Sequence, residues 1–178
     1  MKQIFRKNSL FFLVAIMIAL VNHLSHAQPV VYNQFNLGGE NYVIWEGEIS
    51  YHGNWFSNNA VNIDLVLYSD FDSPSYFQIT FELNVPNGNE SLVAGTYGPT
   101  TSDDPPAFTY VSGYVYIEND PGWQMGSEVI DGTLVVTVTG SGSNAVYTIV
   151  VNCLLDSFFG PITLQGTYRG PLYSDLDY

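Results

Sequence analysis

The chain has 178 residues and carries 17 acidic side chains against four lysines and arginines, a formal charge of −13 at neutral pH. Three of the basic residues, Lys2, Arg6 and Lys7, lie near the N-terminus, so residues 28–178 combine a single arginine with all of the acidic residues. A surface this acidic repels phosphate backbones and anionic lipid. It excludes nucleic acid and membrane surfaces as partners, and it leaves cations, neutral sugars and basic proteins.

Residues 1–27 have the form of a secretory signal peptide. An apolar run at 10–21 follows the basic residues, and the small-residue pattern Ser25-His26-Ala27 places cleavage after Ala27. The run is short for a bilayer and no later run replaces it, so we expect no membrane span. The expected product is a secreted protein, periplasmic or extracellular, with residues 28–178 as a single domain.

Apolar and polar side chains alternate through most of the remaining sequence, and no stretch has the spacing of an amphipathic helix. The alternation predicts strands near residues 42–51, 60–68, 76–85, 107–118, 133–139, 145–153 and 161–169. In the first strand, the side chains expected to face inward are Val43, Trp45, Ile49 and Tyr51. In the fourth, they are Val111, Val115 and Ile117.

Short connections rich in glycine, asparagine and serine join these strands. The segment GSGSN at 140–144 predicts a hairpin between its two flanking strands. Sequential strands joined by short turns pair antiparallel, and strict alternation places one face of the sheet in the core and the other in water. The prediction is an all-β fold, an antiparallel meander that forms either a β-sandwich or an up-and-down, lipocalin-like barrel.

Two short motifs occur twice. YSD at 68–70 returns at 173–175, and GTY at 95–97 returns at 166–168, but in the opposite order, so they do not form a tandem repeat. In YSD we expect the tyrosine to end a strand, and the serine and aspartate to accept hydrogen bonds from nearby backbone N–H groups and so turn the chain.

Four segments together resemble a known family. They are GEISYHGNWFSNNAVNIDLVLYSD, VAGTYGP, IDGTLVVTVTGSGSNAVYTIVVNC and ITLQGTYRGPL. These segments are similar to the small exported all-β modules of secreted and cell-surface proteins in Bacteroidota. The resemblance implies a fold and a compartment, and it carries over no catalytic residue.

Catalytic devices built on cysteine or histidine are not expected. Cys153 is the only cysteine and ends the alternating row Tyr147, Ile149, Val151, which predicts a small buried hydrophobe rather than a reactive thiol. His52 is the only histidine after residue 27 and is predicted to lie in a solvent-exposed loop. A Ser/His/Asp triad or a zinc cluster is therefore not predicted.

The acidic residues suggest two hypotheses. Glu46 and Glu48 share a strand face about 6.6 Å apart, near the roughly 6.5–9.5 Å between the carboxyl groups of inverting glycosidases. If the first three strands are neighbours, Asp64 and Glu82 join this pair on one outer face, where a cation would screen the repulsion. Calcium is the candidate, and further ligands could come from the loop residues Asp70, Asp72, Asp103 and Asp104.

Aromatic side chains favour a sugar-binding surface. We expect Tyr110, Tyr114 and Tyr116 to face outward from their strand, and Trp55 and Trp123 to lie in polar loops. Sugar rings stack on such flat side chains, while amides and carboxylates bind the hydroxyl groups. The sequence thus predicts a secreted, non-catalytic binding or surface-interaction module with carbohydrate as the favoured ligand. The alternatives are a glycan-active hydrolase using Glu46 and Glu48, and a β-barrel carrier of a small apolar ligand.

Overall fold

The computed structural model describes residues 32–54, 59–73, 75–118, 127–157 and 160–174, all within one compact unit, Val31–Tyr178. The predicted signal peptide lies outside the described residues. These residues form eleven strands and one short 3₁₀ turn, η1 (Gly142–Asn144). The strands are β1 (Gln34–Leu37), β2 (Glu40–Val43), β3 (Glu46–Gly53), β4 (Ala60–Tyr68), β5 (Phe77–Pro86), β6 (Gly95–Pro99), β7 (Thr109–Ile117), β8 (Ser127–Thr139), β9 (Val146–Leu155), β10 (Ile162–Gly170) and β11 (Tyr173–Ser174).

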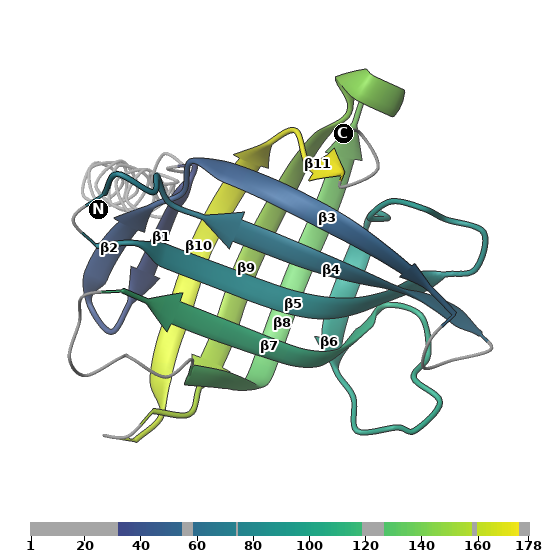
Figure 1. Ribbon diagram of the computed structural model, residues 1–178. Helices are drawn as coiled ribbons and strands as arrows, with labels where there is room; N and C mark the ends of the chain where they lie inside the picture. The colour runs from purple at the N-terminus through teal and green to yellow at the C-terminus, as the bar shows by residue number, and fades with distance from the viewer. Residues whose placement is uncertain (1–31, 55–58, 74, 119–126, 158–159, 175–178) are drawn as a thin grey trace, which may run out of the picture. The chain divides into compact units, whose positions relative to one another are not determined.

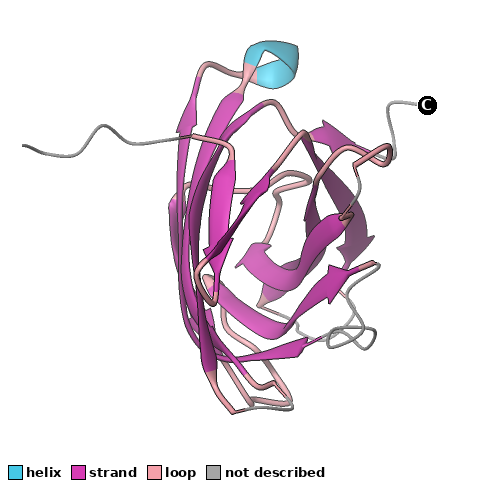
Figure 2. Ribbon diagram, turned by 90° about the vertical axis from the view of Figure 1, so that its left-hand side faces the viewer, coloured by secondary structure: helices cyan, strands magenta, loops and turns pink. Residues whose placement is uncertain are grey.

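The strands belong to one continuous sheet in the order β11-β3-β4-β5-β7-β6-β8-β9-β10-β1-β2. In Figure 1, strands β3, β4, β5 and β7 cross in front of β8, β9 and β10. The view turned by 90° shows that the sheet curls strongly, so that its two halves face each other across the core (Figure 2). The all-β prediction is confirmed, and the curled sheet forms a half-barrel.

The order of the strands departs from a simple meander at three places. Strand β6 lies between β7 and β8 and runs parallel to β7, β11 runs parallel to β3, and β1 pairs with β10. The sequence did not predict β6 as a strand because its five residues bury one side chain, Tyr97, too few to show an alternation. The predicted hairpin at 140–144 does connect β8 to β9, with η1 as its turn.

Alternation is clearest in β4 and β5. The odd-numbered residues 61–67 and 77–85 are buried, while Gln78, Thr80 and Glu82 lie half-buried on the outer face, where Glu82 was predicted; Asn84 is buried. In β9 the row that ends at Cys153 is buried as well. The expectation that Cys153 packs as a small hydrophobe is therefore confirmed.

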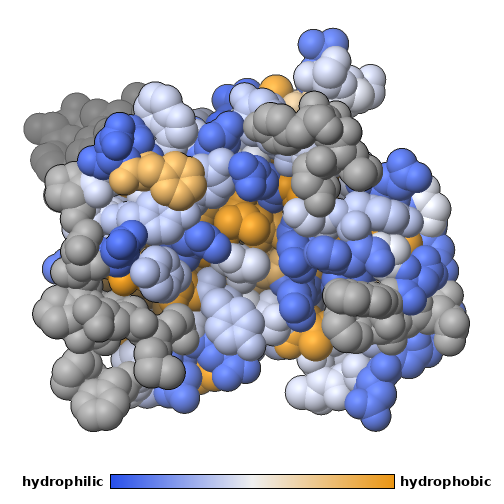
Figure 3. All heavy atoms as spheres, viewed as in Figure 1, coloured by the Kyte–Doolittle hydropathy of each residue, from blue (hydrophilic) through white to orange (hydrophobic). Residues whose placement is uncertain are grey.

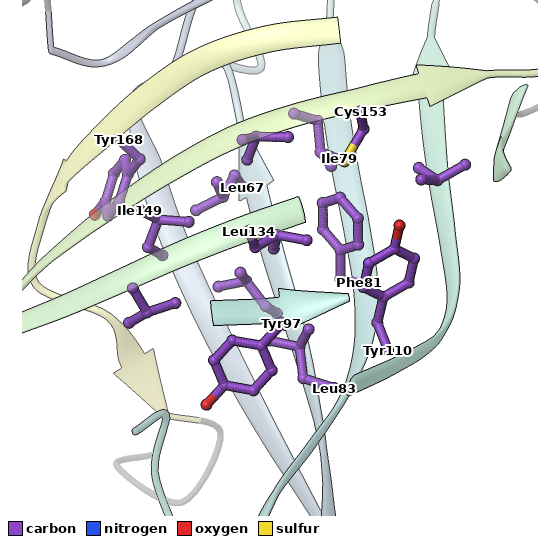
Figure 4. Packing of buried hydrophobic residues seen from close by; sticks show 14 of the residues in the cluster. Leu67, Ile79, Phe81, Leu83, Tyr97, Tyr110, Leu134, Ile149, Cys153 and Tyr168 are labelled. Carbon is purple, nitrogen blue, oxygen red and sulfur yellow. The ribbon is translucent and has the colours of Figure 1, made fainter. Parts of the chain in front are cut away.

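Large side chains from both halves of the sheet fill the interior. Phe81 of β5 meets Tyr110 of β7 edge to face, with ring centroids 5.5 Å apart, and Tyr97 and Tyr168 are also buried. Figure 4 shows these rings interlocked with leucine and isoleucine side chains of the facing strands. Close packing of this kind supplies most of the folding free energy.

The buried phenol and thiol groups predict loss of stability at alkaline pH. Burial raises the pKa of Cys153 from 9.0 to about 11, and burial also raises the pKa of Tyr97, Tyr110 and Tyr168 above 10.0. The unfolded chain therefore releases these protons at lower pH than the folded chain, so stability is fully present below about pH 9 and is lost as the pH rises through 11 and beyond.

Urea unfolding measured from pH 7 to 11 should show a constant free energy up to about pH 9 and then a fall. Titration of Cys153 alone contributes up to about 3 kcal/mol, at about 1.4 kcal/mol per pKa unit. Tyr110→Phe should reduce the alkaline loss, because it removes a phenol whose pKa is raised by burial. A free energy of unfolding that does not change up to pH 11 would contradict this explanation.

The strand predicted at 42–51 is in fact two strands, β2 and β3, which is a correction. The backbone N–H of Ile44 donates to Asn33 O at 2.9 Å, and the next N–H, that of Trp45, donates to Tyr68 O at 2.8 Å. Between these two residues the chain thus passes from one end of the sheet to the other. The alternation of buried and exposed side chains changes parity at the same place. Ile44 is buried, whereas Val43, Trp45 and Tyr51, predicted to face inward, are exposed.

The first YSD motif turns the chain as expected. Tyr68 ends β4, the Phe77 N–H donates to Ser69 Oγ at 2.9 Å, and the Asp72 N–H donates to Asp70 Oδ1 at 3.0 Å. These side-chain acceptors satisfy backbone donors where the sheet ladder stops. Of the second motif, Tyr173 and Ser174 form β11, and the aspartate lies outside the described residues.

Candidate functional site

The tyrosines predicted on an outer face separate into two groups. Tyr114 and Tyr116 are exposed on the outer face of β7, as predicted. Tyr110 is only 1% exposed, which corrects the prediction that it faces outward. The cause is a β-bulge, because Glu82 pairs with Ser112 but Leu83 pairs with Tyr110, so that Val111 is an extra residue and is itself exposed. The two predicted tryptophans, Trp55 and Trp123, lie outside the described residues.

The acidic residues of the first three predicted strands do share one face. Asp64 of β4 lies opposite Ser50 of β3 and Glu82 of β5, and Glu46 and Glu48 project from the same side of β3. The only lysine or arginine after residue 7 is Arg169 on β10, whose guanidinium lies 5.2 Å from the centre of the Tyr32 ring. No lysine or arginine of the described residues therefore offsets these carboxylates.

Glu46 and Glu48 converge on a single hydroxyl group. Tyr68 Oη lies 2.7 Å from Glu48 Oε1 and 3.1 Å from Glu46 Oε2. Burial and the hydrogen bonds to Glu48 and Glu46 raise the pKa of Tyr68 far above its ordinary value, so the phenol keeps its proton. One hydroxyl hydrogen cannot satisfy two carboxylates at once, so within the described part of the chain the pair has more acceptors than it has donors.

The Tyr68 contact describes the Glu46–Glu48 pair of the inverting-hydrolase alternative, which stays a prediction. Inverting glycosidases hold their carboxyl groups roughly 6.5–9.5 Å apart with a water molecule between the sugar and the base. Here the hydroxyl of Tyr68 lies between the two glutamates and holds their nearest oxygens within about 6 Å of each other.

His52 does not lie in a loop, which corrects another prediction. It is an extra residue at a bulge in β3, where Tyr51 pairs with Ile63 and Gly53 pairs with Asn62. Its Nε2 lies 3.0 Å from Asp64 Oδ2, with both side chains about one-third exposed. The bulge therefore turns the imidazole toward the acidic face.

The four aspartates proposed as calcium ligands lie in two separate loops. Asp70 and Asp72 follow the end of β4, whereas Asp104 Oδ2 accepts a hydrogen bond from Asn59, just before β4 begins. The nine residues of β4 separate these loops by about 30 Å, so Asp70 and Asp72 cannot share one ion with Asp103 and Asp104. Within the described ranges, no group of three or more His, Cys, Asp or Glu side chains could hold a metal ion. A calcium site stays a prediction.

A cleft lies along β2, where the chain passes into β3. Its volume is about 330 Å³, and its lining comes from β2, Trp45 and the connection after β4. The lining residues are Glu40, Asn41, Tyr42, Val43, Trp45, Ser69, Asp70, Ser73 and Ser75. Trp45 is 69% exposed. The cleft thus combines a large exposed ring with carboxylate, amide and hydroxyl groups.

Sequence reasoning missed this cleft because it assigned Trp45 to the core. The segment Tyr42–Trp45 reads YVIW, a continuous apolar run in which parity cannot show which side chains point inward. The opposite side of the cleft comes from Ser69, Asp70, Ser73 and Ser75, which lie more than twenty positions further along the chain. A signal was present in Asp70, which was singled out as a possible metal ligand and does line the cleft.

Comparisons with known proteins assign no family: no protein-family model matches the chain, and neither curated proteins nor solved structures give a match. Among the helices of the described residues, none has the length and apolar character needed to cross a membrane.

Proposed function

We propose that the protein is a secreted, non-catalytic binding module whose ligand is a neutral carbohydrate held in the cleft along β2. The observation that carries this proposal is the exposed ring of Trp45 beside a set of polar side chains in a concave site. An indole this exposed gains little from packing, whereas the apolar face of a sugar ring covers it favourably.

The polar lining suits hydroxyl groups. Asp70 uses Oδ1 to accept the N–H of Asp72 and keeps a second oxygen for another donor. The Ser73 hydroxyl donates to Ser75 O and can still accept, and the Ser75 hydroxyl can donate and accept. Glu40 accepts a hydrogen bond from the Tyr42 hydroxyl at 3.2 Å. Charge-assisted hydrogen bonds from sugar hydroxyls to such carboxylates are the strong ones.

The charge of the cleft narrows the ligand class. Glu40 and Asp70 are its two charged lining residues, and both are acidic. Sulfated sugars and uronic acids would be repelled, while neutral sugars would not. A volume near the lower end of ligand pockets, which run from about 300 Å³ upward, suits a short glycan or the end of a longer one.

The packed interior gives the carrier alternative little support. Phe81, Tyr97, Leu134 and Ile149 from facing strands are fully buried and lie against one another in the middle of the described unit. A barrel that carries an apolar ligand needs an internal cavity in that place. The exposed cleft is therefore the better candidate for ligand binding.

The test is glycan binding by Trp45→Ala. We expect the wild-type protein to bind one or more neutral glycans on an array, and Trp45→Ala to weaken that binding at least 10-fold by titration calorimetry, about 1.4 kcal/mol. Thermal unfolding should change little because the side chain is exposed. Tyr114→Ala, which removes an exposed ring outside the cleft, is the matched control and should bind like wild type.

Two results would contradict the proposal. One is an array without any glycan signal for the wild-type protein. The other is equal glycan binding by Trp45→Ala and Tyr114→Ala, which would show that the cleft does not hold the sugar.

A further inference from the structure

The outer face of β3, β4, β5 and β7 carries a second feature, which we call the acidic–aromatic face. It consists of the carboxylates Glu46, Glu48, Asp64 and Glu82 together with the rings of Tyr68, Phe71, Tyr76, Tyr114 and Tyr116. Figure 3 views the molecule from this side, and hydrophilic and intermediate side chains surround an apolar patch at the centre of the view.

The rings form a continuous row at the end of this face. Phe71 and Tyr76 are stacked, with centroids 5.0 Å apart and planes inclined by 14°. Tyr68 continues the row 5.3 Å from Phe71, and Tyr116 lies 6.3 Å from Tyr76. Phe71 is 72% exposed, so an apolar ring stands in solvent beside charged groups.

The glutamates lie against this row. Glu46 and Glu48 share the hydroxyl of Tyr68. Burial, and after it the charge of Glu48, raises the pKa of Tyr76. The pair has unused acceptor capacity. Further along β4, Asp64 Oδ1 is shielded from solvent without a hydrogen-bond partner among the described residues.

A guanidinium group is bound by two kinds of side chain, aromatic rings and carboxylates, and both are present on this face. Arginine stacks its plane on an aromatic face and gives parallel hydrogen bonds to a carboxylate, which lysine cannot do. The chain shows the first of these contacts itself, where Arg169 lies over Tyr32. That arginine projects from β10, in the other half of the sheet, so it is not the group that this face would bind.

We propose that the acidic–aromatic face docks an arginine-bearing segment of a partner protein. One guanidinium lies between the Phe71–Tyr76 rings and the Glu46–Glu48 pair. A second arginine pairs with Glu82, which lies opposite Asp64, four residues back along β4 from Tyr68 and about 13 Å away. Complementary charge speeds and orients such docking, and stacking on the rings makes it specific for arginine.

The geometry defines the probe. A fluorescein-labelled peptide, Gly-Arg-Gly-Ser-Gly-Arg-Gly, places its two arginines four residues apart, which in an extended chain matches the spacing on β4. Binding is measured by fluorescence anisotropy at 150 mM NaCl, beside the same peptide with lysine or with neutral citrulline in place of arginine. We expect the arginine peptide to bind at least 5-fold more tightly than the lysine peptide, and the citrulline peptide not to bind.

Substitutions on the acidic–aromatic face test which side chains contact the arginine peptide. Glu46→Gln/Glu48→Gln should weaken binding of the arginine peptide at least 10-fold, and Phe71→Ala about 5-fold. The matched control, Glu90→Gln/Asp103→Asn, removes the same charge from exposed positions elsewhere and should change binding less than 2-fold. Thermal unfolding of each variant checks that it is folded. Trp45→Ala should leave peptide binding intact, so the glycan proposal can fail while the arginine-docking proposal holds.

Three results would overturn the proposal. The first is that the wild-type protein does not bind the arginine peptide. The second is an equal loss in the two double variants, which would show general attraction to an acidic protein. The third is equal binding of the lysine and arginine peptides together with no effect of Phe71→Ala, which would remove the role of the rings.

Discussion

Phe81→Ala should lower the free energy of unfolding by about 3–5 kcal/mol, because it deletes a fully buried ring and leaves a cavity that its neighbours only partly fill. Phe81 comes from the middle of β5 and meets Tyr110 edge to face, so the substitution also removes that ring contact. In a domain of this size the melting temperature should fall by about 6–20 °C. Urea unfolding and calorimetry measure both quantities.

The matched control for this variant is Phe71→Ala, the same substitution at a ring that is mostly exposed. It should lower the free energy of unfolding by only about 1 kcal/mol, the contribution of its ring contacts with Tyr76 and Tyr68. Equal stabilities of the two variants would show that the packing seen between β5 and β7 does not hold the fold together.

Gly132→Ala should lower the free energy of unfolding by about 3 kcal/mol or more. Gly132 has a φ of +120°, a conformation that costs an L-residue about 1–3 kcal/mol. A Cβ atom there would also lie 2.4 Å from Asn152 O and 2.5 Å from Cys153 Cα, both of which are backbone atoms of β9. Because β8 and β9 must then separate, overpacking adds about 1–3 kcal/mol.

The control for Gly132→Ala is Gly98→Ala in β6, where a Cβ atom would meet nothing within 4 Å. Its free energy of unfolding should equal that of the wild-type protein within about 0.5 kcal/mol. A Gly132→Ala variant as stable as Gly98→Ala would contradict both the backbone conformation and the close approach of β9.

The candidate sites show which side-chain directions can be predicted from the alternation of residues along a single strand. Parity along β4 and β5 predicted that Asp64 and Glu82 share an outer face, and the register confirms it. Parity along β7 predicted Tyr114 and Tyr116 correctly but not Tyr110, because one extra residue at Val111 reverses the pattern. A bulge leaves no mark in the alternation of a short strand, so its position follows from packing against the neighbouring strand.

The cleft along β2 depended on contacts that no local pattern contains. Trp45 lies between β2, which pairs with β1, and β3, which pairs with β4. Its ring is exposed at this change of pairing partner. The cleft's other wall comes from Ser69, Asp70, Ser73 and Ser75, which the folded sheet brings beside β2. The sharing of Tyr68 by Glu46 and Glu48 likewise required the register of β3 against β4.

The amino-acid sequence by itself determined the all-β class, the buried rows of β4, β5 and β9, the YSD turn and the excess of acidic over basic residues, because each follows from neighbours along the chain or from composition alone. Tertiary structure decided the insertion of β6, the bulges at His52 and Val111, the exposure of Trp45 and the meeting of rings with carboxylates on the acidic–aromatic face. The physical reason is that strand order, register and curl are set by how the two halves of the sheet bury their large side chains against each other, which is a property of the whole packed unit.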